Sequence, residues 1–304
     1  MEEIIATILF ADLIDSPELT RGLSTQEYNE MLTDFQNTLF EVVTHHLDFY
    51  GYEGFGIDYE WTVEGDELRI FLYSGQVHFD IRNALLLAIK IKIAWLVSSF
   101  NKRAMKDGHQ ASRIGVGIDC GKVIKDLKPW RMKIGETRPK IEGYAINRTK
   151  HIESASREGR VSQIMVGEGL YSICQLNNRI NISFSPPQNL SFKGLDQKMQ
   201  IYEVVSFINF EVLPSMPSSF QEGLLEKMEH IAGNGVPEPW VLIILLRSYI
   251  SMLASGEDEI LVAKALDLAQ QALKVLDYKV VIYNMLGWLY SNCKSAHTLK
   301  PAGR

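Results

Sequence analysis

The sequence contains few cysteines, and it has no excess of positive charge. Its three cysteines, Cys120, Cys174 and Cys293, are too few for a disulfide framework and show no metal-ligand spacing, which indicates a reducing compartment. The chain of 304 residues carries 31 Lys and Arg against 37 Asp and Glu, so its net charge is −6. This balance provides no overall attraction to nucleic acid or to an anionic membrane, and neither is an expected partner.

Long uncharged apolar runs are also missing. The run "ALLLAIKIKIAWLV" contains Lys90 and Lys92, and "WVLIILLRSYISML" contains Arg247. Neither run reaches the roughly 20 apolar residues that a membrane-spanning helix needs. The start, "MEEIIATILF", lacks the cationic flank of a signal peptide. We therefore expect a cytoplasmic protein without membrane insertion.

The first two hundred residues mix strand and helix patterns without strict alternation. The β-branched run "IIATILFAD" predicts a buried strand that ends at Asp12. Ser24 and Glu27 have the spacing of a capping box and predict the start of a long helix. The strands "YEWTV" and "ELRIFLY" flank Gly65 and Asp66 as a hairpin. This mixture predicts an α+β sheet that is covered by helices on one face.

Three further elements follow along the chain. The segment 78–105 predicts one long apolar helix, and "RIGVGID" and "KVIKDL" predict a hairpin that turns at "CG". A polar helix is expected from about Tyr144 to Gly159.

The composition changes near residue 206. The stretch "PSMPSS" lies in an expected linker over 207–219, and only helix patterns follow over 220–298. "YNMLGWLYSNC" contains a Leu-Gly-x-x-Tyr pattern that resembles a tetratricopeptide repeat, but about one and a half repeats are too few for a free-standing solenoid. We expect these helices to form either a brace on the first domain or a contact with a partner.

Two aspartates point to a metal site. Asp12 ends a strand and Asp66 lies in a tight turn, so paired strands would place both carboxylates at one end of the sheet. Each residue alone is also typical of an ordinary turn or cap. Neighbouring carboxylates repel one another, and a divalent cation relieves that repulsion. Oxygen ligands of this kind suit Mg²⁺ or Mn²⁺ acting on a phosphate substrate.

The segment "KIEGYAINRTKHIES" supplies the opposite charge. Asn147 and His151 are four residues apart and share one helix face, which Arg148 and Lys150 flank. Lys193 and Lys198 lie beside a late strand. Cations and an amide donor beside a metal site are what a triphosphate needs. A solvated helix surface is the alternative explanation for each cation.

Five motifs, in order, resemble the class III nucleotidyl cyclases, the family of the adenylyl and guanylyl cyclases. They cover residues 1–206 and are "TILFADLIDSPEL", "VEGDELRIFL", "RIGVGIDCGKVI", "EGYAINRTKHIESASREG" and "FKGLDQKMQIYEV". Each motif is loose, whereas the ordered set is specific. The resemblance implies a ferredoxin-like α+β core, here with a small C-terminal all-helical extension. It also implies a homodimer whose sites lie at the interface.

The resemblance also implies roles for individual residues. Asp12 and Asp66 would hold two Mg²⁺ or Mn²⁺ ions, with help from the backbone carbonyl of Leu13. Asn147 would position the ribose, and Lys193 would contact the triphosphate.

The chain departs from the family pattern at the catalytic helix. The Arg that stabilises the transition state falls on His151, and an Ala of the motif falls on Thr149. As a hypothesis, His151 donates to the transferring phosphoryl group while Arg148 or Lys150 supplies permanent charge.

The two base-reading positions fall on Thr62 and Lys140, which match neither the adenine nor the guanine pattern. The chain therefore resembles the pyrimidine cyclases of bacterial anti-phage signalling, the Pycsar systems. Their cyclic UMP or cyclic CMP acts on a separate effector protein.

Lys140 can only donate hydrogen bonds, and uracil presents carbonyl acceptors where cytosine and adenine carry an amino group. The bulky Tyr59, Trp61 and Tyr144 are expected to narrow the pocket against guanine. We therefore expect UTP as substrate, with 3′,5′-cyclic UMP and pyrophosphate as products.

Three alternatives remain open at this point. The protein is a cytidylate cyclase, a divergent adenylyl or guanylyl cyclase, or a degenerate cyclase domain that binds a nucleotide or a partner without catalysis. Asp12 and Asp66 argue against the last alternative, and His151 argues for it.

Overall fold

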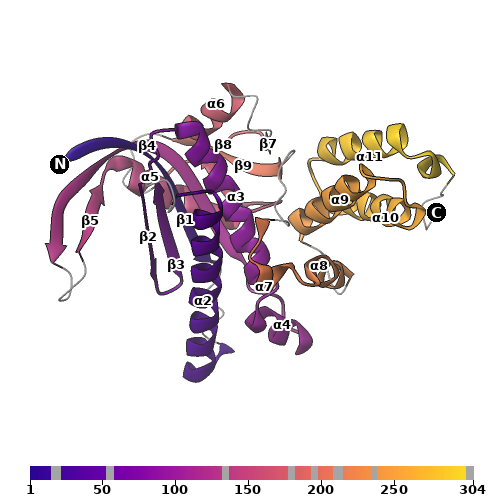
Figure 1. Ribbon diagram of the computed structural model, residues 1–304, viewed down its shortest axis with the longest axis horizontal. Helices are drawn as coiled ribbons and strands as arrows, with labels where there is room; N and C mark the ends of the chain where they lie inside the picture. Colours follow the sequence, from indigo (N-terminus) through magenta and orange to yellow (C-terminus); the bar gives the residue numbers. More distant parts are fainter. Residues whose placement is uncertain are drawn as a thin grey trace.

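The computed structural model describes residues 1–14, 22–52, 58–131, 137–176, 182–192, 198–207, 215–233 and 238–298, without the side chains of 127–131, 137–139 and 207. A large mixed sheet with helices on both faces makes up the first two thirds of the chain, and a group of helices follows it (Figure 1).

Within these described residues the sheet has nine strands. Strand β1 lies near the centre, antiparallel to both β3 and β4, and β4 is parallel to β6. In spatial order the main path is β2 (Tyr59–Glu64), β3 (Glu67–Leu72), β1 (Glu2–Leu13), β4 (Ile114–Arg131), β6 (Ile164–Gly167), β9 (Met199–Phe207) and β7 (Ile182–Phe184). Two further strands lie off this path, β5 (Thr137–Glu142) beside β4 and β8 (Gln188–Leu190) beside β9. The predicted α+β class is confirmed.

One face of the sheet carries the main core. Helices α2 (Thr25–Phe49) and α3 (Val77–Leu96) pack there, together with α6 (Glu168–Leu176), against the alternate residues of β1 that point to this side. The predicted capping box is confirmed at the start of α2, because the Ser24 amide donates to Glu27 Oε2 at 2.7 Å and the Glu27 amide donates to Ser24 Oγ at 3.2 Å.

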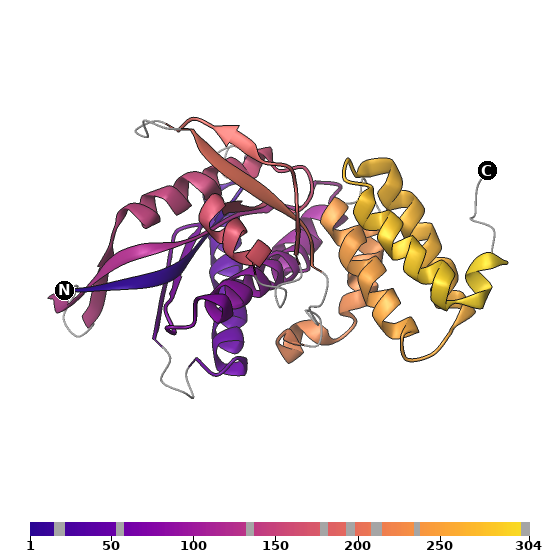
Figure 2. The same cartoon turned by 90° about the horizontal axis from the view of Figure 1, so that it is seen from above.

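The other face is covered by α5 (Tyr144–Ala155), so the predicted one-face arrangement is wrong. A smaller cluster that includes Ile8, Phe10 and Ala145 fills the space between this helix and the sheet. Figure 2 shows α5 and α3 on opposite sides of the strands. Glycine in β4 explains the close approach, since a Cβ on Gly117 would lie 2.2 Å from the backbone nitrogen of Glu153.

The hairpin predicted at Cys120 and Gly121 is also wrong. Strand β4 runs straight through both residues, which pair with Thr7 and Ala6 of β1. The Cys-Gly pair resembles a turn in sequence, but β1 is long enough to pair on either side of it. The structure has one 18-residue strand where we expected a bend.

The long helix predicted over 78–105 is two helices instead. Helix α3 ends at Leu96, and α4 (Ser99–Lys106) starts after Ser98, whose hydroxyl accepts from the Asn101 amide at 3.2 Å. The side-chain cap gives the backbone a new helix start, and the two axes differ by 46°. In the described part of the chain no single helix has the length and apolar character needed to cross a membrane, and only this bent pair meets both criteria together.

The C-terminal region is entirely helical where it is described. Several polar contacts join the region after residue 206 to the sheet and its helices. Among them, Lys90 Nζ donates to the Ser215 carbonyl at 2.6 Å, and Arg247 Nη2 donates to Ser206 Oγ at 2.8 Å. Arg160 Nη1 also donates to Asp277 Oδ2 at 3.1 Å. The elements of this region are α7 (Ser218–Gln221), α8 (Leu224–Gly233), α9 (Pro239–Leu253), α10 (Glu259–Val275), α11 (Val280–Asn292) and a 3₁₀ turn (Lys294–His297). Their apolar residues continue the main core. These contacts favour a brace, and the boundaries 1–206, 207–219 and 220–298 stay predictions.

Candidate active site

Asp12 lies at the end of the sheet opposite an acidic residue of the neighbouring strand. It is the second-last residue of β1, and its partner in the β1–β3 register is Glu67. The tight turn before Glu67 contains Gly65, with φ of +64°, and Asp66. The positive φ suits glycine and lets the hairpin close directly beside Asp12. The predicted meeting of the two strand ends is therefore present.

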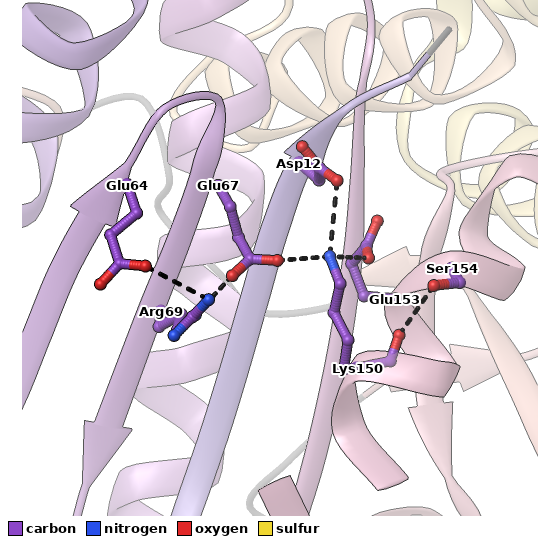
Figure 3. Close-up of polar contacts among 7 residues, drawn as sticks. All are labelled: Asp12, Glu64, Glu67, Arg69, Lys150, Glu153 and Ser154. Carbon is purple, nitrogen blue, oxygen red and sulfur yellow. Dashed lines mark hydrogen bonds and ion pairs between the residues drawn. The ribbon is translucent and has the colours of Figure 1, made fainter. Parts of the chain in front are cut away.

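Lys150 of α5 reaches into this acidic group. Its Nζ lies 2.5 Å from Glu67 Oε2, 2.7 Å from Glu153 Oε2 and 3.4 Å from Asp12 Oδ2. Figure 3 shows the ammonium between the three carboxylates, which come from β3, α5 and β1. On the far side of Glu67, Arg69 bonds to the same carboxylate and lies 3.5 Å from Glu64 Oε2.

The electrostatics of Asp12 suit a cation. Burial raises the pKa of its carboxyl, and the nearby charge of Asp66 raises it further, while Lys150 lowers it. Asp12 Oδ1 is buried and has no hydrogen-bond partner. A buried carboxylate oxygen without a partner is costly, and a bound hard cation would satisfy it. Asp12 and Asp66 therefore fit the predicted Mg²⁺ or Mn²⁺ site.

Asp12 and Asp66 do not by themselves form a complete set of metal ligands. Among the residues that the structure describes, no three acidic, His or Cys side chains form a group that is ready to hold a metal ion. Leu13, whose carbonyl was expected to assist, is buried at the end of β1 and pairs with Ile114. The metal roles of Asp12, Leu13 and Asp66 stay predictions.

Arg148 lies beside this group but serves another acid. Its Nε donates to Asp119 Oδ2, and its Nη2 donates to the Cys120 carbonyl at 3.0 Å. The Asp119 side chain is 0% exposed, and burial raises its pKa while Arg148 opposes that shift. Arg148 thus ties α5 to β4, which leaves less of its charge for a triphosphate than the sequence suggested.

The outer face of α5 carries the remaining predicted groups. Tyr144 and Asn147 are exposed, and His151 is partly buried with its ring stacked on Phe192 at a centroid distance of 5.1 Å. An exposed Asn147 suits a site that is completed by a second subunit. The stacking fixes the ring of His151, while its expected donation to a phosphoryl group stays a prediction. Lys193 lies outside the described residues.

The expected pocket wall around Thr62 needs one correction. Thr62 lies opposite Arg69 in the β2–β3 register, on the sheet face that α5 covers. Tyr59 and Trp61 lie on the other face, where both pack against the α2–α3 core. Side chains alternate along a strand, so residues at odd positions of β2 point away from Thr62. Tyr59 and Trp61 therefore do not line a pocket with it.

Lys140, the second base-reading candidate, lies on β5 and forms an ion pair with Glu142. Its side chain is 40% exposed. The pairing of Lys140 and Thr62 through a base stays a prediction.

Sequence reasoning missed two acids of this site, Glu67 and Glu153. The available signals were positional: Glu67 directly follows Asp66, and Glu153 lies three residues after Lys150 on the same helix face. Arg69, which binds Glu67 and Glu64, was also missed.

The fold is that of the class III cyclases. No protein-family model matches the sequence, and no curated protein matches it. Among solved structures, the guanylyl cyclase Cya2 is 20% identical with a TM-score of 0.51, over 67% of this chain and 92% of that one. The adenylyl cyclase CyaB from P. aeruginosa is 18% identical with a TM-score of 0.54, over 70% of this chain and 98% of that one. The predicted ferredoxin-like cyclase core, with added C-terminal helices, is confirmed.

Proposed function

We propose that the protein is a class III nucleotidyl cyclase, and that its substrate is UTP. One observation carries the cyclase assignment: the fold matches 92% and 98% of the length of two cyclase structures. The nearness of Asp12 and Asp66 at one end of the sheet supports the metal role that we propose for them. The buried, unpartnered Oδ1 of Asp12 supports a cation there.

The reaction forms one P–O bond, breaks another P–O bond and the O–H bond of the 3′-hydroxyl, and releases pyrophosphate. The ribose 3′-oxygen bonds to the α-phosphorus, the bond from that phosphorus to the β-phosphate bridging oxygen breaks, and the 3′-hydroxyl proton leaves to solvent. Two divalent ions, when bound, would neutralise triphosphate charge and acidify the 3′-hydroxyl.

The chain's own residues would hold and orient the substrate. Asp12 and Asp66 supply anionic oxygen ligands, and the exposed amide of Asn147 would fix the ribose. His151, oriented by Phe192, would donate a hydrogen bond to the transferring phosphoryl group.

The proposal for the base rests on Lys140 and Thr62. Lys140 is a donor without acceptor capacity, so it fits a uracil carbonyl and mismatches the amino group of cytosine or adenine. A buried mismatch of this kind costs on the order of 1–3 kcal/mol. Before it binds a base, Lys140 must exchange its ion pair with Glu142.

The proposed setting is bacterial antiviral defence. In the Pycsar systems that the sequence resembles, cyclic UMP acts on a separate effector protein. We propose the same for this chain, acting as a homodimer with sites at the interface.

Replacing Asp66 tests the cyclase assignment. Asp66→Asn should abolish formation of a cyclic nucleotide from UTP and Mn²⁺ while the protein stays folded, because an amide lacks the anionic oxygen that the ion requires. Glu64→Gln, in the same hairpin, is the matched control and should keep most of the activity. A folded Asp66→Asn protein with full turnover would contradict the metal assignment. Absence of turnover in the unmutated protein, with nucleotide still bound, would favour a degenerate domain instead.

A second variant tests the base. Lys140→Asp replaces a hydrogen-bond donor with an acceptor, which can bind the amino group of cytosine. The preference for UTP over CTP should therefore fall. The measurement is kcat/KM for both substrates. An unchanged ratio would remove Lys140 from the specificity argument and leave the cyclase assignment standing.

A further inference from the structure

Lys150 occupies an unusual place for a residue beside a metal-binding pair. The resemblance assigns no role to this position, which lies between the two motif positions Thr149 and His151. Its ammonium is nevertheless the centre of the acidic group (Figure 3). It contacts Glu67, Glu153 and Asp12, and it is 38% exposed while the Glu153 side chain is only 2% exposed.

The charges in this group do not balance. Four carboxylates lie in or beside it, namely Asp12, Asp66, Glu67 and Glu153. Lys150 is shared among three of them, and Arg69 divides its charge between Glu67 and Glu64. The group therefore keeps an excess of negative charge, which attracts further cations.

The contacts of Lys150 differ in length in an informative way. Its bonds to Glu67 and Glu153 are short, at 2.5 and 2.7 Å, whereas Asp12 Oδ2 lies at 3.4 Å. Asp12 also keeps the buried Oδ1 without a partner. Asp12 is thus the carboxylate that Lys150 satisfies least and that a metal ion can take over most readily.

We propose that Lys150 is a tethered counter-cation: it holds the carboxylates together in the metal-free protein, and a divalent cation binds at Asp12 and Asp66 in competition with it. The inference rests on the proposed function, since it uses the same metal site. When the ion binds, Asp12 turns from Lys150 to the metal, and Lys150 stays with Glu67 and Glu153. A purely structural ion pair between α5 and β3 is the rival explanation, and it predicts no effect on metal affinity.

Metal binding itself provides the test, without nucleotide or turnover. Mn²⁺ is titrated into the full-length protein, and the free ion is followed by electron paramagnetic resonance. Lys150→Met should bind Mn²⁺ at least about tenfold more tightly than the unmutated protein, because a positive charge within a few ångströms of the ion is removed. Lys150→Arg keeps the charge and should keep the original affinity. Asp12→Asn should lose the binding.

A second pair of variants guards against misfolding. Lys150→Met leaves Glu153 buried without its partner, which is destabilising. The comparison is therefore repeated in a Glu153→Gln background, where no buried carboxylate is left alone. Adding Lys150→Met to Glu153→Gln should again tighten Mn²⁺ binding about tenfold. The unfolding temperature is higher in Mn²⁺ than in EDTA when the ion binds, and this difference should be larger in the double variant than in Glu153→Gln.

The outcomes separate the two proposals. Equal or weaker Mn²⁺ binding after loss of Lys150, with binding still lost in Asp12→Asn, overturns the counter-cation and leaves the cyclase site standing. Binding that Asp12→Asn does not alter, or no binding in any variant, overturns both. The inference predicts tighter binding whenever Lys150→Met is introduced, in the unmutated protein and in the Glu153→Gln background, and unchanged binding in Lys150→Arg.

Discussion

Arg148 shows how one contact limits what a residue contributes. Sequence reasoning placed it among the cations that would meet a triphosphate, but its guanidinium bonds to Asp119, a side chain with no exposed surface. Gly167 is part of the same arrangement, because a Cβ there would lie 2.7 Å from the Asp119 carboxylate. The pair fixes α5 on β4 and so positions the helix that carries Asn147 and Lys150.

Removing this pair should therefore cost stability. Arg148→Met leaves a buried carboxylate unpaired, and we expect the free energy of unfolding to fall by about 3–5 kcal/mol. Urea unfolding measures it. The double variant Arg148→Met/Asp119→Asn should recover part of the loss, because no buried charge remains. An Arg148→Met protein with unchanged stability and lost activity would instead indicate that Arg148 binds the triphosphate.

His46 is a second residue whose surroundings decide its chemistry. It is fully buried in α2, both ring nitrogens lack hydrogen-bond partners, and burial together with the charge of Lys90 holds its pKa well below 6.5. At pH below about 6.5 the unfolded chain binds a proton at this position that the folded protein does not. The contribution of neutral His46 to the free energy of unfolding is therefore fully present above that pH and is lost as the pH falls below it.

The pH dependence of unfolding tests this effect. Between pH 7 and 5.5, His46→Leu should lose less free energy of unfolding than the unmutated protein, by up to about 1.4 kcal/mol per pH unit. Denaturant unfolding at several pH values measures both slopes. Parallel slopes would show that His46 accepts a proton in the folded state.

At the scale of elements, the distance between α5 and β4 controls the site. Three residues of β4 on this face are glycines, and Gly115, Gly117 and Gly121 each leave room for a side chain or the backbone of the segment above. This close packing lets Lys150 and Glu153 reach Asp12. Any side chain at Gly117 would push the helix outward.

Gly117→Ala tests this geometry. Its Cβ would lie 2.2 Å from the Glu153 nitrogen and 2.5 Å from its Cα, so the helix must move. We expect a loss of about 3 kcal/mol in the free energy of unfolding. Gly169→Ala is the matched control, since the nearest atom there is 3.9 Å away. Equal stability of the two variants would contradict the account of the α5–β4 contact.

The elements also show how far the sequence predicts this structure. Local patterns were sufficient for β1, the capped α2 and the hairpin at Gly65, because strand alternation, a cap and a turn are encoded by neighbouring residues. The course of β4 through Cys120 was missed, since pairing with a distant strand decides it. Glu67 and Glu153 each lie next to a predicted site residue in sequence, but only the packing of α5 on the sheet brings both of them to Lys150. Period-two alternation alone was enough to separate Tyr59 from Thr62, and that separation would have removed Tyr59 from the pocket.

At the scale of the whole molecule, the proposed homodimer makes a testable demand. Asn147 is exposed, whereas the Asp12 group lies between α5 and the sheet end of its own chain. In the proposed dimer, each site combines Asp12 and Asp66 of one chain with Asn147 of the other. Two equivalent sites follow from a two-fold axis.

Mixing two inactive variants should then restore activity. Asp66→Asn and Asn147→Ala are each expected to be inactive, but a mixed dimer has one site built wholly from unmutated residues. With random exchange of subunits in an equal mixture, half of the dimers are mixed, and we expect about a quarter of the original activity. Subunit exchange is verified with differently tagged chains. Exchanged mixtures that stay inactive would contradict the shared site.

The most direct test of the proposed function is a competition among the four ribonucleoside triphosphates. The unmutated protein is incubated with equal concentrations of UTP, CTP, ATP and GTP and with Mn²⁺, and the cyclic products are resolved by mass. A nucleotidyl cyclase with Lys140 at the base is predicted to release mainly cyclic UMP, with cyclic CMP second. Dominant cyclic CMP would contradict the assignment of Lys140, and a dominant purine product would contradict the pyrimidine assignment. Failure to form any cyclic nucleotide would contradict the proposed function itself.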